Sequence, residues 1–316
     1  MNLTKITKIT TESSQKGQRI DKFLSDFDST ISRSKWQKII KEGQILTNNK
    51  EVKADYVLKE NDVIQILPAK KEIKKKKKIP DVKIIYEDDA VIVLDKPAGV
   101  LSQDAPSSPS PSLTDFLLNY YPPIKNVGES EDRCGIVHRL DKDTSGIIIV
   151  AKNEKSFLFL KNQFQNREVQ KTYMALVYGN IKEKEGKIEL KIGRSKSKPN
   201  MQTVIDSKRK KEIKSREALT FYKVQKTFPN YTLLAVFPKT GRMHQIRVHL
   251  KSIGHPIVGD QKYFFKKNVE IKPKLNRQFL HASELEIKLP NGKTKIFESS
   301  PANDLNDFLL KISSLD

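Results

Sequence analysis

The stretch HRLDKDTSGIIIVAKN, residues 138–153, places charged groups of both signs directly before one of the most apolar runs in the chain. Arg139 and Asp141 are two residues apart, so on an extended backbone they project to the same face. The next residues, DKDTSG, are rich in turn formers, and Gly146 suits a sharp bend. Because the run IIIVA predicts a buried strand, the pattern predicts a charged turn held rigidly at the edge of a core strand.

Two interpretations of this turn are open. In the first, its Asp and Thr side chains hydrogen-bond the local backbone and have no further role. In the second, Asp141 stands on a rigid loop beside cationic neighbours, which keep a carboxylate ionised. An ionised Asp can act as a nucleophile or as a general base. The residues of the turn do not by themselves decide between the two.

Charge indicates the kind of partner. The chain has 316 residues, enough for one large or two moderate domains, and a formal net charge of +21. A surface this basic attracts polyanions such as nucleic acid or an anionic membrane. A membrane role is disfavoured, because no apolar run approaches the ~18 residues of a spanning helix and the first residues lack the apolar core of a signal peptide.

Cysteine and histidine usage narrows the class further. Cys134 is the only cysteine, so an intrachain disulfide is impossible and a reducing cytoplasm is expected. One Cys and five scattered His residues give no zinc-ligand spacing, so no metal is expected.

Residues 17–68 are predicted to form a small α/β domain that follows an N-terminal tail, residues 1–16. In RIDKFLSDF, apolar residues recur at the spacing of one helix face. Ser32 or Ser34 can cap a second helix, which Gly43 ends.

The rest of the small domain is predicted to be strands. ILTNNKEV, residues 45–52, predicts a strand and a turn, and NDVIQIL, residues 61–67, predicts another strand. Residues 69–80, AKKEIKKKKKIP, form a linker in which the Lys side chains repel one another. The linker is interpreted either as a flexible spacer or as an arm that touches phosphates.

Residues 81–316 are predicted to form a second domain in which strands outnumber helices. Many of the strands are joined by short turns, such as those at residues 229–230 and 291–292. This pattern predicts an α+β fold with a mixed, mainly antiparallel sheet. Strands are expected at residues 82–86, 90–95, 146–151, 171–181, 218–228, 231–238, 279–289 and 294–299, and helices at residues 113–121, 155–169 and 240–253.

The predicted helix TGRMHQIRVHLKSI carries a second polar cluster. Thr240 can cap it, and Met243, Ile246, Leu250 and Ile253 are spaced as an inward stripe. Arg247 falls on another face with His244 and Lys251. This face is interpreted either as solvated and basic, or as part of a polar site.

Three segments in this order, HRLDKDTSG, KTYMALVYG and TGRMHQIRVHL, resemble the RluA-type pseudouridine synthases. The resemblance continues through KPAG at 96–99, GHPIVGD at 254–260 and FLHASELEI at 279–287, and covers residues 81–300. GQRIDKFL with SRSKWQKIIKEGQI resembles the S4 RNA-binding domain. The pieces NYYPPI, CGIVHRLDKDTSG and IGRSKSKPNM look most like the RluD-like group, which modifies large-subunit ribosomal RNA, with RluC-like enzymes as close competitors.

The resemblance implies roles for individual residues. Asp141 matches the family's catalytic carboxylate, and Arg247 matches the basic residue that pairs with it. Tyr173 matches the Tyr that packs against the target base and helps with proton removal. Arg139 matches the Arg that fills the place of the flipped base. His138 receives no catalytic role.

The resemblance also implies the reaction and the partner. The expected reaction isomerises a uridine of 23S ribosomal RNA, or of the assembling large subunit, to pseudouridine. It needs neither cofactor nor metal, and the enzyme is expected to be a cytoplasmic monomer. The basic segment 193–216 is interpreted as an RNA-contacting flap or a loop. The small domain is expected to bind RNA through residues on or beside its second helix: Arg33, Lys35, Lys38 and Lys41.

Three alternatives remain beside this expectation. A non-catalytic RNA-binding or ribosome-assembly protein would keep the fold but lose Asp141, Tyr173 or Arg247, and all three are present. The same reaction on transfer RNA stays open. A two-carboxylate glycosidase is disfavoured, because Asp141 and Asp143 are too close together in a turn to flank a sugar.

Overall fold

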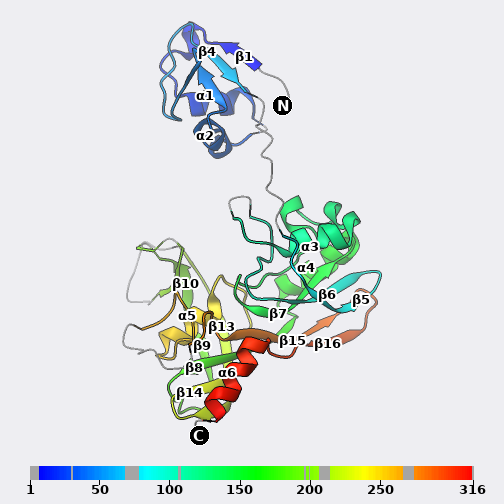
Figure 1. Ribbon diagram of the computed structural model, residues 1–316. Helices are drawn as coiled ribbons and strands as arrows, with labels where there is room; N and C mark the ends of the chain where they lie inside the picture. Colours follow the sequence, from blue (N-terminus) through cyan, green and yellow to red (C-terminus); the bar gives the residue numbers. More distant parts are fainter. Residues whose placement is uncertain are drawn as a thin grey trace. The chain divides into compact units, whose positions relative to one another are not determined.

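The structure, a computed structural model, divides into two compact units, residues 1–75 and 76–316 (Figure 1). The small unit has one hydrophobic core and the large unit has two. Most of the predicted Lys-rich linker lies outside the residues that the structure describes. Those residues are 7–29, 31–67, 78–105, 108–195, 197–198, 200–205, 214–265 and 274–314.

In the small unit two helices pack on a four-stranded antiparallel sheet of order β1-β4-β2-β3. The helices bury Ile20, Leu24, Trp36 and Ile40, which recur at helical spacing. Gly43, with φ of +71°, ends the second helix as predicted. The elements are β1 (Thr7–Thr10), a 3-10 helix (Ser13–Gln15), α1 (Ile20–Phe27), α2 (Arg33–Lys41), β2 (Ile45–Thr47), β3 (Lys50–Glu51) and β4 (Val63–Ile66).

The prediction of a tail over residues 1–16 is wrong for the part that the structure describes. Strand β1 pairs with β4 along its whole length, and the Thr11 hydroxyl donates to the Lys59 carbonyl at 2.6 Å. This strand was hard to predict because TKIT is short and contains a single apolar residue, Ile9, which packs on the core. The small unit therefore begins at least as early as Thr7.

The large unit is built on one long sheet of order β5-β6-β7-β15-β8-β14-β13-β9, with β16 also paired to β15. Within the described residues its pairs are antiparallel except β7 with β15, so the sheet is mainly antiparallel, as predicted. The strands are β5 (Lys83–Glu87), β6 (Val91–Lys96), β7 (Ser145–Ala151), β8 (Gln170–Tyr178), β9 (Glu185–Glu189), β13 (Leu219–Phe228), β14 (Tyr231–Pro238), β15 (Leu280–Lys288) and β16 (Thr294–Glu298).

Strand β15 joins two halves of this sheet. One core gathers around β5, β6 and β7, and the other around β8, β14 and β13. Figure 1 shows α3 and α4 with the first half and α6 along the second. The helices of this unit are α3 (Leu113–Tyr120), 3-10 helices (Pro122–Asn126 and Glu131–Arg133), α4 (Glu154–Asn166), α5 (Gln245–Ser252) and α6 (Asn303–Ser313).

The basic segment 193–216, read from the sequence as a flap or a loop, contains strands. Three short strands form a separate antiparallel sheet of order β11-β10-β12. Its pairing is short, which explains why no apolar period stands out in the sequence. The strands are β10 (Lys191–Arg194), β11 (Gln202–Ile205) and β12 (Ser215–Arg216), and residues 196, 199 and 206–213 lie outside the described part of the chain.

Candidate active site

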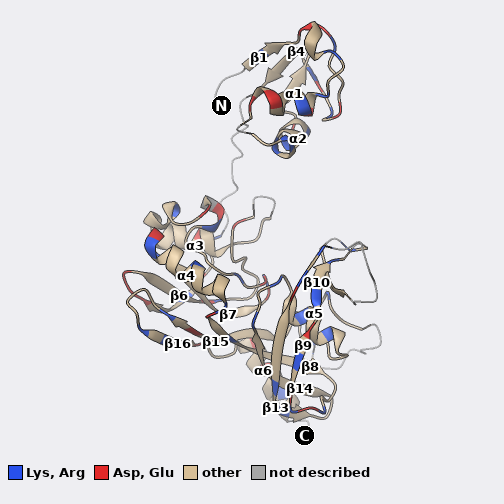
Figure 2. Cartoon of the chain, turned by 180° about the vertical axis from the view of Figure 1, so that it is seen from behind, with Lys and Arg blue, Asp and Glu red and all other residues tan. Residues whose placement is uncertain are grey.

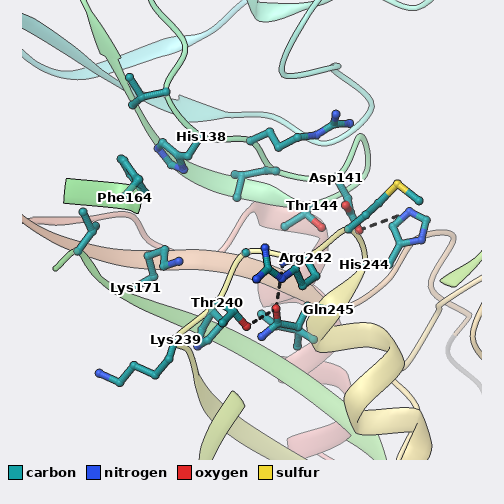
Figure 3. Close-up of a pocket in the computed structure, with 18 of the residues that line it drawn as sticks. His138, Asp141, Thr144, Phe164, Lys171, Lys239, Thr240, Arg242, His244 and Gln245 are labelled. Atoms are coloured by element: carbon teal, nitrogen blue, oxygen red, sulfur yellow. Dashed lines mark hydrogen bonds and ion pairs between the residues drawn. The ribbon is translucent and has the colours of Figure 1, made fainter. Parts of the chain in front are cut away.

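A pocket with a volume of about 800 Å³ is lined by residues from both halves of the large sheet. The walls come from the turn before β7, from α4, from β8 and from the segment that leads into α5 (Figure 3). Two carboxylates, Glu129 and Asp141, face a much larger number of cationic side chains. The nine Lys and Arg residues in the lining are Arg133, Arg139, Lys161, Arg167, Lys171, Arg216, Lys239, Arg242 and Arg247.

The turn that carries Asp141 is held mainly through its backbone. The Thr144 amide donates to the Asp141 carbonyl at 3.1 Å, which closes the turn predicted from DKDTSG. The Ser102 hydroxyl donates to the Leu140 carbonyl at 2.9 Å, and the Leu140 amide donates back to it. The Asp141 side chain is left 21% exposed, facing the pocket.

Lys96, at the end of β6, is fully buried behind this turn. Its ammonium group donates to the carbonyls of Pro97, Val100 and Lys142 at 2.8–2.9 Å. An ammonium has three donors, so these carbonyls use all of them. Burial lowers the pKa of Lys96 to about 7, against the opposing effect of nearby carboxylates. Lys96 therefore holds the loop after β6, residues 97–100, against the loop that carries Asp141.

Arg247 connects two carboxylates. Its Nη1 donates to Asp141 Oδ2 at 2.8 Å, while its Nε and Nη2 bind both oxygens of Asp260 at 2.7 and 2.8 Å. Burial opposes ionisation of Asp260, but hydrogen bonds from Arg247 and from the amides of Lys262 and Tyr263 lower its pKa. The guanidinium is thus fixed in direction by a buried anion and presents its remaining arm to Asp141.

The interpretation of Arg247 as part of a solvated basic face is wrong, because its side chain is 5% exposed. The predicted start of the helix is also too early. His244 has left-handed backbone angles, φ 55° and ψ 21°, so α5 begins at Gln245 and Thr240 does not cap it. Because the helical period starts after this break, Met243 lies outside it and is 41% exposed.

Gln245 organises the turn before α5. Its side-chain oxygen accepts from the Thr240 hydroxyl at 2.7 Å and from the Arg242 amide at 3.0 Å. Its side-chain nitrogen donates to the Leu219 carbonyl and the Thr220 hydroxyl, both at 3.0 Å. Figure 3 shows the two contacts of the side-chain oxygen as dashed lines. A buried amide with all these partners fixes the backbone that presents His244.

His244 stands beside the carboxylate. Its Nε2 lies 4.0 Å from Asp141 Oδ2, the oxygen that Arg247 also binds. On its other side, His244 Nδ1 is 2.8 Å from the Tyr263 hydroxyl, which also accepts from the Gln202 amide of β11 at 2.7 Å. The imidazole is 10% exposed, so one edge of it reaches the pocket.

Tyr173 lies on β8, opposite Ala282 of β15 and Val236 of β14. It lines the pocket together with Asp141. Burial and the nearby Asp141 carboxylate raise the pKa of Tyr173, so its phenol stays protonated at neutral pH. Lys171, two residues earlier and also in the pocket lining, has a pKa lowered to about 8 by burial and by the charge of Lys239.

His138 and Arg139, neighbours in the HRLD segment, differ in their contacts and in their exposure to solvent. The His138 ring stacks on Phe164 with centroids 4.5 Å apart, and its Nε2 accepts from the Ile149 amide at 3.0 Å. Burial lowers the pKa of His138 to about 3, so the ring is neutral. Arg139 is exposed and contributes to the same pocket.

The four predicted RNA-binding residues of the small unit lie on α2, where Figure 2 colours basic positions of the ribbon blue. Arg33 is partly committed to structure, because it donates to the buried carboxylate of Asp21 at 3.0 Å. Lys38 pairs with Glu42 at 3.6 Å and is 71% exposed. Lys35 and Lys41 are exposed.

Several residues of the site were not assigned from the sequence. Asp260 was part of the GHPIVGD segment but received no role, although a carboxylate directly after a glycine was a usable signal. Gln245 and Lys96 were inside quoted motifs, but their partners are backbone groups that a sequence does not display. Within the described residues, no group of three or more His, Cys, Asp and Glu side chains could hold a metal ion, and no helix is long and apolar enough to cross a membrane.

The comparisons agree with this division into two units. The family model described as RNA pseudouridylate synthase matches residues 90–252, and the S4 domain matches residues 18–64. In solved structures, human RNA pseudouridylate synthase domain containing 1 has a TM-score of 0.55 and 25% identity, covering 74% of this chain and 95% of its own. The fold is therefore that of an enzyme class that isomerises uridine in RNA.

Curated relatives extend the match over nearly the whole chain. The uncharacterised RNA pseudouridine synthase YlyB of Bacillus subtilis (strain 168) is 35% identical over 303 residues, 95% of this chain and 96% of its own. Ribosomal large subunit pseudouridine synthase C of Buchnera aphidicola subsp. Schizaphis graminum (strain Sg) is 33% identical over 298 residues, 90% of each. Ribosomal large subunit pseudouridine synthase D of Borreliella burgdorferi (strain ATCC 35210) is 42% identical over 219 residues, 69% of this chain and 64% of its own.

The chain belongs to the RluA-type RNA pseudouridine synthases that carry an N-terminal S4 domain. It is an isomerase that acts on RNA.

Proposed function

We propose that this enzyme isomerises uridines of large-subunit ribosomal RNA and that Asp141 is its nucleophile. The observation that carries the assignment of the nucleophile is the Asp260–Arg247–Asp141 network at the pocket, in which a buried ion pair aims one guanidinium arm at one carboxylate oxygen. Arg247 binds Oδ2, and no described residue donates a hydrogen bond to Oδ1. Oδ1 is therefore the oxygen available to attack C1′ or C6 of the nucleotide.

The cationic lining supports an RNA substrate. A uridine within folded RNA must leave its stack before Asp141 can reach it, at a cost of a few kcal/mol. Basic side chains around the pocket bind the phosphates on either side of the displaced nucleotide. Arg139, exposed and in the same lining, is assigned to the gap that the displaced base leaves.

We assign Tyr173 the role of contacting the target uracil base. Its position in the lining with Asp141 suits packing against a pyrimidine, which has a flat π-face. Because its pKa is raised, Tyr173 enters the reaction as the neutral phenol. It can take the C5 proton only after its own proton has passed to another group.

The choice of ribosomal RNA rests on the relatives and the small unit. Two relatives are named as ribosomal large subunit synthases, one of type C and one of type D. On the basis of the sequence motifs, we favour the RluD-like group for this chain and place the RluC-like group second. An S4 domain with exposed Lys residues on α2 supplies a second RNA contact. We place the enzyme in the cytoplasm with its ribosomal substrate, as a monomer that needs neither metal nor cofactor.

The test is tritium release from ribosomal RNA transcripts labelled at uridine C5, with wild type and Asp141→Asn compared side by side. Isomerisation breaks the C5–H bond, so wild type is expected to release tritium. Asp141→Asn keeps the shape of the side chain but is a very poor nucleophile, so release should fall by at least ~10⁴-fold. Binding of both proteins to the same transcript provides the control that the variant is folded.

Three other outcomes would change the assignment. Release from transfer RNA transcripts but not from ribosomal RNA would keep the reaction and replace the substrate. Equal release by wild type and Asp141→Asn would remove Asp141 as the nucleophile. Binding with no release from either RNA, or from isolated ribosomal particles, would support the alternative of a non-catalytic assembly factor.

A further inference from the structure

The 4.0 Å gap between His244 Nε2 and Asp141 Oδ2 is too long for a hydrogen bond. It is short enough that one atom can lie within about 3 Å of both groups. Since both side chains line the pocket, that atom can belong to the bound nucleotide. Oδ2 is an acceptor, so the shared atom must carry a hydrogen to give to Asp141.

The hydrogen bonds around His244 favour one position for its ring proton. Tyr263 accepts from the Gln202 amide, so its own hydroxyl hydrogen is free to point at His244 Nδ1. Nδ1 then acts as the acceptor, and the ring proton sits on Nε2, facing Asp141. The left-handed backbone of His244 is unusual for a residue with a side chain, and the Gln245 contacts fix it in place.

The surroundings also keep the ring neutral. Burial lowers the pKa of His244, Arg247 and Lys262 lower it further, and Asp141 and Asp260 oppose them. The net direction is downward, so at neutral pH His244 is a neutral donor through Nε2. The atom in the gap must therefore accept one hydrogen bond from His244 and donate one to Asp141. A hydroxyl group does both.

We propose that His244 and Asp141 together bind the ribose 2′-hydroxyl of the target uridine, which makes His244 a catalytic residue that recognises RNA rather than DNA. The inference rests on the proposed function, because it needs Asp141 beside the nucleotide. The 2′-hydroxyl is the group that distinguishes ribose from deoxyribose. Its carbon is bonded to C1′, so holding it at Oδ2 brings C1′ next to the same carboxylate. In glycosidases, comparable hydrogen bonds to a sugar 2-hydroxyl strengthen in the transition state.

The arrangement ties strand β11 to the reaction. Gln202 is the first residue of β11, and its amide sets the direction of the Tyr263 hydroxyl. Without the contact from Gln202, Tyr263 could turn its hydrogen elsewhere and His244 could place its proton on Nδ1. The donor toward the nucleotide would then be lost. The position of β11 therefore determines whether the hydroxyl site is complete.

The test uses an RNA oligonucleotide that carries one uridine mapped by the tritium assay, and a copy with 2′-deoxyuridine at that position alone. Both are labelled at C5 of this nucleotide. Wild type should release tritium from the ribonucleotide about 10- to 100-fold faster than from the deoxynucleotide. His244→Ala should slow release from the ribonucleotide by about 10-fold and leave release from the deoxynucleotide nearly unchanged.

His244→Gln is the matched variant, because its amide nitrogen can donate from nearly the position of Nε2. It should keep most of the preference for ribose. An equal slowing of both substrates by His244→Ala would mean a structural role and overturn the proposal, as would a wild type that does not distinguish the two sugars. Wild type that releases no tritium from the ribonucleotide would refute the proposed function itself, and the inference with it.

Discussion

Asp260 is buried and aims Arg247, so its charge matters although it does not reach the substrate. Asp260→Asn is expected to lower the rate of tritium release on the order of 10²-fold, because a misplaced catalytic group costs about that much. RNA binding should be retained, since the cationic lining is unchanged. Release rates at saturating RNA, with binding measured separately, check this.

Glu87→Gln provides the control. Glu87 also forms an ion pair, with Lys152 at 2.7 Å, but it lies outside the pocket lining. Its loss should leave the rate of release unchanged. A comparable fall in both variants would show that loss of stability, rather than the direction of Arg247, lowers activity.

His138 is expected to make stability depend on pH. Its pKa is about 3 in the folded protein and ~6.5 in the unfolded chain, so below pH 6.5 only the unfolded chain takes up this proton. The free energy of unfolding therefore falls as pH drops from 6.5 toward 3, by up to ~1.4 kcal/mol per pH unit from this group. The Asn side chain of His138→Asn cannot titrate. The difference in free energy of unfolding between wild type and this variant should therefore shrink at lower pH.

Urea unfolding at several pH values, followed by circular dichroism, measures this difference. The single tryptophan, Trp36, lies in the small unit, whereas His138 lies in the large one. Trp36 fluorescence therefore follows the unfolding of the small unit and serves as an internal control. Parallel curves for wild type and variant would show that His138 accepts a proton in the folded state.

At the scale of the element, the bend between the Asp141 turn and β7 depends on Gly146. Its φ is +112°, and an added Cβ would overlap the backbone of Ala282 on β15. Gly146→Ala is therefore expected to lower the free energy of unfolding by more than ~3 kcal/mol and to reduce activity in the folded fraction. Gly292→Ala is the matched variant: φ is +85° there, but nothing lies within 4 Å.

Comparing the two variants separates the cost of a left-handed backbone from the cost of steric overlap with Ala282. Gly292→Ala should cost only about 1 kcal/mol, the penalty of a left-handed backbone. Urea unfolding of the two variants gives the difference, and equal losses would mean that β7 and β15 can move apart to admit a methyl group.

Elements with a strong local pattern could be predicted from the sequence. The β13–β14 and β15–β16 hairpins have alternating or apolar strands and clear turns, and they form as predicted. Strand β9, strand β1 and helix α6 went unassigned, since β1 and β9 each bury little and α6 follows a hairpin without a strong cap. The start of α5 was missed because only a tertiary contact network holds His244 in its left-handed conformation.

At the scale of the whole molecule, charge on the small unit should govern part of the salt dependence of RNA binding. Replacing Lys35, Lys38 and Lys41 by Gln is expected to reduce the slope of log affinity against log salt by roughly 2–3, since each phosphate contact contributes ~0.7–0.9. The rate of tritium release at saturating RNA should not change. Filter binding at several salt concentrations provides the slope.

An equal removal of charge elsewhere on the same unit is the control. Lys8, Lys50 and Lys53 are exposed and lie outside α2, on β1, on β3 and in the loop after β3. The same change of slope in this variant would mean that α2 is not the RNA-binding surface and that only net charge matters.

The site shows what a sequence can reveal at this scale. Asp141, Tyr173 and Arg247 are separated by up to 106 positions, and only the family resemblance brought them together beforehand. The structure places them around one pocket. Asp260 and the His244–Tyr263 pair could not be assigned, because their roles come from partners in distant segments that carry no pattern of their own.

The central place of β15 has a consequence for the order in which the enzyme is made. Translation runs from the N-terminus, so the small unit has all its described strands once Ile66 is out of the ribosome. The strand that joins the two halves of the large sheet is complete only with Lys288. At ~5–20 residues per second, the 222 residues between them (288 − 66) take roughly 10–45 s. A nascent chain can thus hold RNA through its first unit while the two halves of the catalytic sheet still lack the strand that joins them.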